Sequence, residues 1–365
     1  MMDKALYAQV HAVFIEACAL VPVEQGVFLD RACVGCPEVR AEVEELLSQL
    51  TEGELFEMEA PPDDPMRIVG VVIDGRYRVD AYVAMGGSSH VYRGWDLERE
   101  QPVALKLFRE SFAVEPCHLG EAFVREGEIL AQLSRQTTSV VRSLDLGTWT
   151  SSRGHPVTYT VLEWLEGETL EAMLSDDRRQ WTLDEVMRIL GPVAEVLGLA
   201  HGEGIAHRDI KPANIFVQSE GKGLKLMDFG AAKLAAHYSR GFDGTANIAS
   251  PFTVNYAAPE QAAAQGAPTG PRTDVYALAL TCVEMLAGRP PYARADVSTV
   301  LAQALDTRRR PTPRTLGVKI SGAVEAVFKA ALAVDPRARP ADATAFWVAL
   351  DEARRDRRRW FNRWR

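Results

Sequence analysis

The most informative stretch of the chain reads HRDIKPAN and spans residues 207–214. It places a carboxylate (Asp209), an ammonium group (Lys211) and an amide that can bind a metal (Asn214) within six consecutive positions. Phosphoryl transfer needs these groups together, because a hydroxyl must be oriented, the charge of the moving phosphate offset and Mg²⁺ held. A second carboxylate, Asp228, follows nineteen residues after Asp209 and begins a tight DFG turn. These residues therefore predict a phosphoryl-transfer site.

The bulk properties of the chain indicate a folded protein. Its 365 residues suit one large domain with a small one, or two medium domains. Hydrophobic residues make up 47% and charged residues 25%, which is too apolar for wholesale disorder. The net charge of −9 disfavours a general nucleic-acid binder. No signal peptide or transmembrane run is visible, and five cysteines favour a reducing compartment, so we expect a cytoplasmic protein.

Residues 1–58 are predicted to form a small helical unit, because apolar residues recur there at three- and four-residue steps. Residues 59–67 are a linker by composition, since three prolines and three acidic residues fall between positions 59 and 65. Cys33 and Cys36 could be half of a zinc site or a redox pair, but no second CxxC pair follows them. We therefore favour two half-buried thiols near a helix end.

From residue 68 the pattern changes to short strand-like runs and then to a long helical remainder. The runs cover residues 76–84, 90–95, 102–108, 140–148 and 158–164, with a helix at 119–133. This order predicts an α+β domain over residues 68–352, in which a small sheet lobe joins a large helical lobe. Residues 353–365 form a tail with seven arginines after position 353. We favour a solvated helix end there over weak membrane-surface or nucleic-acid contact.

HRDIKPAN and the DFG turn resemble the catalytic and metal loops of bacterial eukaryotic-like (Hanks-type) Ser/Thr protein kinases. Other motifs of that family follow in its order over about residues 74–350. They are AMGGSSHV at 84–91, VALK at 103–106, VREGEIL at 124–130, TVLEWL at 160–165 and FTVNYAAPE at 252–260. The resemblance implies the bilobal protein-kinase fold and transfer of the ATP γ-phosphate to Ser or Thr hydroxyls of proteins.

By this resemblance, four residues act in catalysis. Asp209 would orient the substrate hydroxyl, and Lys211 would neutralise charge on the γ-phosphate. Lys106 would hold the α- and β-phosphates, and Glu126 would fix Lys106 through an ion pair. Glu128 is the rival partner, but two residues along a helix turn it to another face, so we favour Glu126.

The resemblance also predicts where ATP and its metal bind. Asn214 and Asp228 are expected to hold Mg²⁺, with Mn²⁺ as the alternative ion, while phosphate oxygens and water complete the shell. In the glycine-rich turn, Ala84 and Ser89 replace two of the family's three glycines. The residues expected to contact the nucleotide are Ala84, Gly86, Gly87, Ser88, Val91, Ala104, Lys106, Leu162, Glu163 and Leu165.

Arg208 implies regulation, because an arginine before the catalytic aspartate commonly pairs with a phosphorylated residue that orders the activation segment. Thr245 and Ser250 are the favoured acceptors, and phosphorylation of one copy by another would need self-association. Thr253 is expected in the substrate pocket, beside the catalytic loop. This position is a further mark of kinases that act on Ser and Thr.

Three further residues take structural roles in the resemblance: Glu260 and Arg339 as a buried ion pair, and Asp274 as the anchor of the catalytic loop.

A pseudokinase-like ATP-binding or scaffold module is the alternative function, which intact Lys106 and Asp209 disfavour. A small-molecule kinase is disfavoured because such enzymes lack the peptide platform. A P-loop ATPase is excluded, since the chain has no GxxxxGK[ST] motif.

Overall fold

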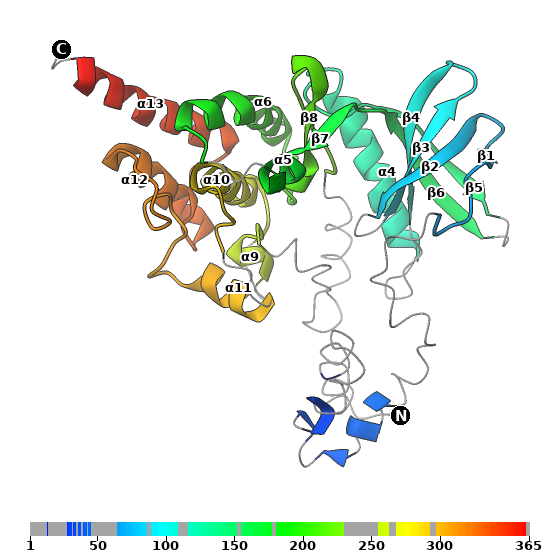
Figure 1. Cartoon of the computed structure of the whole chain (residues 1–365), viewed down its shortest axis with the longest axis horizontal. Coiled ribbons are helices and arrows are strands. Elements are labelled where there is room, and N and C mark those ends of the chain that lie inside the picture. The colour runs from blue at the N-terminus through cyan, green and yellow to red at the C-terminus, as the bar shows by residue number, and fades with distance from the viewer. Residues whose placement is uncertain are drawn as a thin grey trace. The chain divides into compact units, whose positions relative to one another are not determined.

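The computed structural model of the chain divides into two compact units, Met1–Arg67 and Ile68–Arg365, each described by itself below (Figure 1). The residues that the structure describes are 13, 28–30, 32–33, 36–37, 39–41, 43–44, 64–85, 89–108, 116–151, 155–176, 180–229, 255–262, 268–292 and 297–362.

The first unit is largely helical at the positions described between residues 28 and 44. Its small apolar cluster consists of Leu29, Cys33, Val39 and Val43, with Val13 and Phe28 packed against it. Both cysteines are free thiols. Cys33 is buried and Cys36 is exposed, so the expectation of two half-buried thiols is wrong. No cluster of three or more His, Cys, Asp or Glu in the described part of the chain could hold a metal ion.

The second unit begins with a six-stranded sheet in the order β1-β2-β3-β4-β6-β5, and all its neighbouring strands are antiparallel. The strands are β1 (Val72–Ile73), β2 (Tyr77–Met85), β3 (Ser89–Asp96), β4 (Gln101–Phe108), β5 (Ser143–Thr150) and β6 (Pro156–Glu163). Each strand-like run predicted from the sequence overlaps one of β2 to β6. The two-residue β1 is too short to give a periodic pattern.

One helix, α4 (Pro116–Leu133), packs on this sheet and contacts β5 and β6 (Figure 1). Leu130 and Leu133 of α4 are buried, and so are Leu105 and Leu107 of β4. Side chains on that face of the helix lie at i, i+3 and i+4 spacing, so Glu126 shares the buried face with Leu130. The packing of α4 therefore decides which of its acidic residues can reach the sheet.

The rest of the second unit is mainly helical and surrounds α10 (Pro271–Ala287), in which every residue from 273 to 287 is buried. The long helix α6 (Leu183–Gly202), which contacts α10, starts with a reciprocal cap: Thr182 Oγ1 accepts from Glu185 N, and Glu185 Oε2 accepts from Thr182 N. The other helices are α5 (Leu170–Asp176), α9 (Pro259–Ala262), α11 (Val297–Leu305), α12 (Gly322–Ala331) and α13 (Ala343–Asn362), with short 3₁₀ turns η1 (Pro212–Asn214), η2 (Ser219–Gly221) and η4 (Pro336–Ala338).

A second, three-stranded sheet was not predicted from the sequence. Its antiparallel strands are β7 (Gly167–Thr169), β8 (Ile215–Gln218) and β9 (Leu224–Leu226). β8 begins immediately after the 207–214 loop, and β9 ends two residues before Asp228. This small sheet therefore sets the distance between the two motifs that dominate the sequence.

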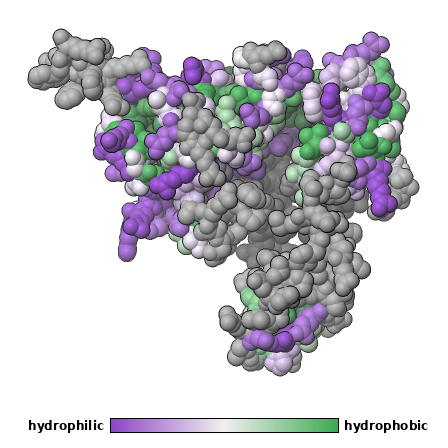
Figure 2. Space-filling model, in the orientation of Figure 1, coloured by the Kyte–Doolittle hydropathy of each residue, from purple (hydrophilic) through white to green (hydrophobic). Residues whose placement is uncertain are grey.

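The predicted tail from residue 353 begins inside α13, which continues to residue 362. Arg354 of α13 forms ion pairs with Asp184 of α6 and with Asp351. Hydrophilic residues alternate with smaller hydrophobic patches over the described part of the face in Figure 2. Among the described residues, no helix combines the length and the apolar character needed to cross a membrane.

Candidate active site

Lys106 stands at the centre of the candidate site. It lies on β4 and is 6% exposed. Its Nζ lies 2.7 Å from Glu126 Oε1 on α4 and 2.7 Å from Asp228 Oδ1, just after β9. Glu128, the rival partner, is exposed and lies 3.1 Å from Arg125 instead. The structure thus brings together three residues that come from three separate motifs.

The charges of this triad shift one another's pKa values. Burial lowers the pKa of Lys106, but the carboxylates of Asp228 and Glu126 outweigh it and hold that pKa above its ordinary value. Burial raises the pKa of Glu126. Burial also acts to raise the pKa of Asp228, but the Lys106 ammonium group holds it below its ordinary value. Lys106 is therefore charged at neutral pH and offers a fixed cation at low dielectric.

Asp274 of α10 holds the 207–214 loop in place. It is 0% exposed, and its two oxygens accept from His207 N at 2.7 Å and from Arg208 N at 2.6 Å. His201 Nε2 lies 2.9 Å from the same carboxylate. Arg208 has a φ of 64°, a left-handed conformation that costs a non-glycine residue roughly 1–2 kcal/mol. The bonds to Asp274 therefore stabilise a conformation that the loop would otherwise avoid.

His207 is fully buried between the loop and the DFG turn. Its Nδ1 accepts from Asp209 N at 3.2 Å, and its Nε2 lies 2.8 Å from the Met227 carbonyl oxygen. An amide must donate and a carbonyl must accept, so these partners fit the neutral ring with its proton on Nε2. Burial lowers the pKa of His207, in keeping with that neutral form. The ring also packs on Phe229, with ring centroids 4.6 Å apart.

Asp209, Lys211 and Asn214 lie together on the loop. Lys211 Nζ is 3.2 Å from Asp209 Oδ2. Asn214 Nδ2 donates to the Asp209 carbonyl oxygen at 2.7 Å and lies 3.1 Å from Asp209 Oδ2. Because the amide nitrogen faces Asp209, the atom that Asn214 can offer to a metal is Oδ1. This oxygen and the carboxylate of Asp228 are hard ligands of the kind that Mg²⁺ prefers.

The predicted nucleotide contacts that the structure describes lie on β2, β3, β4 and β6 and just after β6. Strand register places Val91 of β3 opposite Lys106, and Ala104 of β4 opposite Leu162 of β6. Leu162 is 9% exposed, and Glu163 and Leu165 are half-buried at the connection to the helical part. Ala84 is exposed and pairs with Val91. The predicted residues outside the described part of the chain are Gly86, Gly87, Ser88, Thr245, Ser250 and Thr253.

Residues 77–348 match the family described as the protein kinase domain. This chain belongs to that family. It is 35% identical over 242 residues to the probable serine/threonine-protein kinase PknB of Corynebacterium glutamicum, covering 66% of this chain and 36% of the relative. It is 32% identical over 312 residues to serine/threonine-protein kinase pkn3 of Myxococcus xanthus, covering 83% of this chain and 54% of the relative.

A third relative is serine/threonine-protein kinase PknL of Mycobacterium tuberculosis, 33% identical over 297 residues and covering 80% of this chain and 69% of the relative. Among solved structures, the PknI kinase domain of Mycobacterium tuberculosis has a TM-score of 0.59 and 25% identity, and the match covers 78% of this chain and 98% of that one. The chain spans only 36% and 54% of the lengths of the PknB and pkn3 relatives. The match to the solved domain supports the bilobal kinase fold.

The kinase domain also contains the expected buried ion pair between Glu260 and Arg339. Arg339 Nη2 lies 2.7 Å from Glu260 Oε2, and its side chain is 0% exposed. The neighbouring Gln261 donates to the Arg208 carbonyl oxygen at 2.9 Å. The 207–214 loop is thus held from two sides, by Asp274 on α10 and by Gln261 on α9.

Two polar pairs of the kinase domain were missed by reasoning from the sequence. Lys225 of β9 lies 2.5 Å from Glu163 at the end of β6, and 62 positions separate them. Tyr256 donates to Glu284 of α10, and burial is the main cause that raises the pKa of both groups. No spacing rule joins residues this far apart. The one signal in the sequence is a charged residue inside an apolar run, which Lys225 and Glu284 both show.

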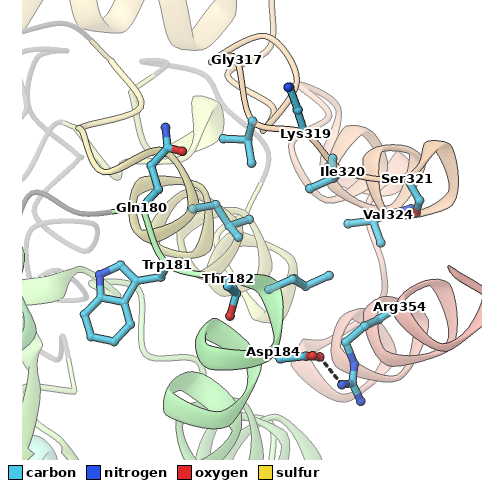
Figure 3. Close-up of a pocket in the computed structure, with 13 residues that line it drawn as sticks. Gln180, Trp181, Thr182, Asp184, Gly317, Lys319, Ile320, Ser321, Val324 and Arg354 are labelled. Carbon is cyan, nitrogen blue, oxygen red and sulfur yellow. Dashed lines mark hydrogen bonds and ion pairs between the residues drawn. The ribbon is translucent and has the colours of Figure 1, made fainter. Parts of the chain in front are cut away.

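A separate pocket of about 740 Å³ lies away from this site, in the helical part of the domain (Figure 3). It lies between the start of α6, the segment before α12 and the Arg354 side chain of α13, whose ion pair with Asp184 closes one side. Leu286 and Val324 are among the apolar side chains that line it. It shares no residue with the candidate active site.

Proposed function

We propose that the domain at residues 77–348 is a Ser/Thr protein kinase that transfers the γ-phosphate of ATP to hydroxyls of protein substrates. The observation that carries the proposal is the position of Lys106, with its Nζ 2.7 Å from both Glu126 and Asp228. Phosphoryl transfer by kinases requires the lysine–glutamate pair and the DFG aspartate to be in place at once. The names of the relatives, all serine/threonine-protein kinases, support the same activity.

Each residue of the site has a distinct part in the proposed reaction. Asp209 accepts a hydrogen bond from the substrate hydroxyl and orients its attack on the γ-phosphorus. Lys211, 3.2 Å from Asp209, stabilises the charge that spreads over the transferring phosphoryl oxygens. Lys106 holds the phosphates that remain as the leaving group. Most of the rate then comes from positioning and charge stabilisation, since the transfer requires little covalent chemistry from the protein.

The donor atoms of the site fit Mg²⁺. Asn214 through Oδ1 and Asp228 through its carboxylate would hold the ion, and Mn²⁺ has similar ligand preferences. When bound, the ion supplies neutralising charge at the phosphates and fixes their orientation. The hydrogen bonds from Asn214 to Asp209 fix the position of the proposed metal ligand relative to the residue that would orient the hydroxyl.

Transfer from radiolabelled ATP tests the activity on the protein itself and on a generic basic protein. Wild type should transfer label to Ser or Thr, and Asp209→Asn should lower the rate by about two to four orders of magnitude. Lys106→Met should be similarly impaired. Lys222→Met, which removes an exposed lysine from the turn before β9, is the matched control and should behave as wild type. ATP binding by wild type without any transfer would replace the proposal with the ATP-binding or scaffold module.

We propose also that phosphorylation of the activation segment controls this domain through Arg208. Thr245 and Ser250 are the proposed acceptors, modified by a second copy of the chain. Arg208 supports the idea by its place next to Asp209, because a phosphate paired with its guanidinium would act directly on the loop. Mass spectrometry after incubation with ATP should find phosphate between residues 231 and 252. A fully active enzyme with none there would contradict this form of control.

A further inference from the structure

The side chain of Glu163 is held by three contacts at the point where the two lobes join. Its Oε1 lies 2.5 Å from Lys225 Nζ and accepts from Arg142 N at 2.9 Å, and its Oε2 accepts from Arg142 Nε at 3.3 Å. Its own backbone N donates to the Arg142 carbonyl oxygen at 3.1 Å. We call Arg142, Glu163 and Lys225 the hinge cluster. It fixes the last residue of β6, where the chain leaves the sheet. We call residues 163–165 the hinge.

Lys225 contributes the link from this cluster to the helical lobe. It is the central residue of β9 and is 7% exposed, unusual burial for a lysine. Besides Glu163, its Nζ donates to the Val140 carbonyl oxygen at 3.3 Å. The backbone repeats the same connection, because Val141 N donates to the Leu226 carbonyl oxygen at 3.1 Å. A single buried ammonium group therefore joins β9, the segment before β5 and the hinge.

The position of Lys225 in the chain gives this link a consequence for the nucleotide. Asp228 follows it by three residues, so along extended backbone the two are within about 10 Å. Asp228 in turn lies 2.7 Å from Lys106, which β4 holds. A ligand that reaches from the Glu163 backbone to Asp228 must match the distance between them. The Lys225–Glu163 pair and the Lys106–Asp228 pair are both formed in this one arrangement.

We propose that Lys225 is a positioning residue for the nucleotide: through Glu163 it fixes the distance between the hinge and Asp228. The inference rests on the proposed function and places adenine at the hinge and the metal-bound phosphates at Asp228. A ligand that touches both ends gains from this preorganisation, because the protein need not be ordered on binding. A ligand that touches only the hinge gains nothing from it.

Calorimetric binding of Mg²⁺-ADP and of adenosine to the full chain tests the inference without requiring turnover. Lys225→Met should weaken Mg²⁺-ADP binding about tenfold, the scale of one lost hydrogen bond to a charged group. Adenosine, which reaches only the hinge, should bind as it does to wild type. Glu163→Gln should give the same split, because it removes the charge but keeps the backbone and an acceptor for Arg142. Lys222→Met is the matched control and should leave both affinities unchanged.

The two substitutions separate positioning from a simple effect of charge on an anionic ligand. Charge alone would make Lys225→Met weaken Mg²⁺-ADP binding and Glu163→Gln strengthen it, and that pattern would overturn the inference. Equal losses of affinity for Mg²⁺-ADP and for adenosine, or no loss of affinity for either, would also overturn the inference. The double variant should bind no more weakly than either single one, since both break the same contact. If Lys225→Met fails to fold, the result for Glu163→Gln alone tests the inference. If wild type binds no Mg²⁺-ADP, the proposed function itself is overturned.

Discussion

The two walls of the candidate nucleotide site are held in different ways. The 207–214 loop is bonded to the fully buried Asp274 of α10 and to Gln261 of α9, and its Arg208 keeps a left-handed backbone. The opposite wall, formed by β2 and β3, rests on strand pairing, and Ala84 at the end of β2 is exposed. Buried polar contacts tolerate few substitutes, because each lost partner leaves an unpaired donor or charge. Strand pairing uses backbone atoms and tolerates many side chains.

This difference explains why the sequence keeps a full HRDIKPAN loop beside an altered glycine-rich turn. The loop places charges, and charge positions must be held to fractions of an ångström for phosphoryl transfer. In protein kinases the glycine-rich loop lies over the ATP phosphates, so what the family requires of that loop is space and backbone conformation. Substitutions that break each wall should therefore differ in size, and they can be ranked.

The largest effect is expected from Glu260→Ala, behind the loop wall. It leaves Arg339, 0% exposed at its side chain, without its carboxylate partner, which should cost about 3–5 kcal/mol of unfolding free energy. Urea unfolding at neutral pH measures the loss. The matched control is Arg337→Ala. Arg337 lies two residues before Arg339, and its exposed ion pair with Asp335 should make no measurable contribution to the free energy of unfolding. Equal losses in the two variants would contradict the contrast between buried and exposed pairs.

The next effect is expected from Asp274→Asn, which keeps the shape of the anchor but removes one acceptor. One of the two backbone N–H groups at His207 and Arg208 then loses its partner, at a cost of about 1–3 kcal/mol in stability. The strained Arg208 can relax, and a shift of the neighbouring Asp209 by about 1 Å should lower kcat about a hundredfold. Steady-state kinetics and urea unfolding measure both. A normal kcat in a destabilised variant would show that Asp274 serves folding alone.

The sequence predicted the parts of this fold that are periodic or contiguous. The strands β2 to β6 and the α4 helix give alternating or helical apolar patterns over six or more residues, and each predicted run overlaps the observed element. The loop residues are adjacent in sequence, so their proximity follows from the chain itself. Glu126 could be preferred over Glu128 because helical spacing puts only one of them on the buried face.

The sequence could not predict contacts that depend on tertiary packing. β7 and β9 have three residues each, too few for a pattern, so the small sheet was missed. Lys225 lies inside an apolar run, where a lysine is normally expected to extend its charge to solvent. In the structure it instead pairs with Glu163, which lies 62 positions earlier in the chain. A buried lysine needs a partner for its charge, and this partner is supplied by the packing of β9 beside residue 140 and the end of β6.

A smaller effect is expected from pH, through His207. Burial lowers its pKa below the ordinary value of 6.5, so the unfolded chain binds a proton there more readily than the folded one. The stability that neutral His207 provides is therefore complete above pH 6.5 and falls as the pH drops toward the lowered pKa. Urea unfolding between pH 7.5 and 5.5 should show this loss. His207→Gln cannot titrate and should give a flatter profile; an equally steep one would assign the loss to other groups.

The smallest effect is expected from Ala84→Gly, which restores a glycine of the family's turn. Ala84 is not among the described residues with positive φ, and as an exposed strand residue it has no backbone need for glycine. The substitution should leave the KM for ATP nearly unchanged and cost about 0.5–1 kcal/mol in stability, since glycine is more flexible when unfolded. Gly94→Ala in β3 is the reference substitution for this comparison, because a Cβ at Gly94 would lie 2.7 Å from the Arg78 carbonyl oxygen. A large fall in KM for Ala84→Gly would show that this wall, too, is held to a narrow shape.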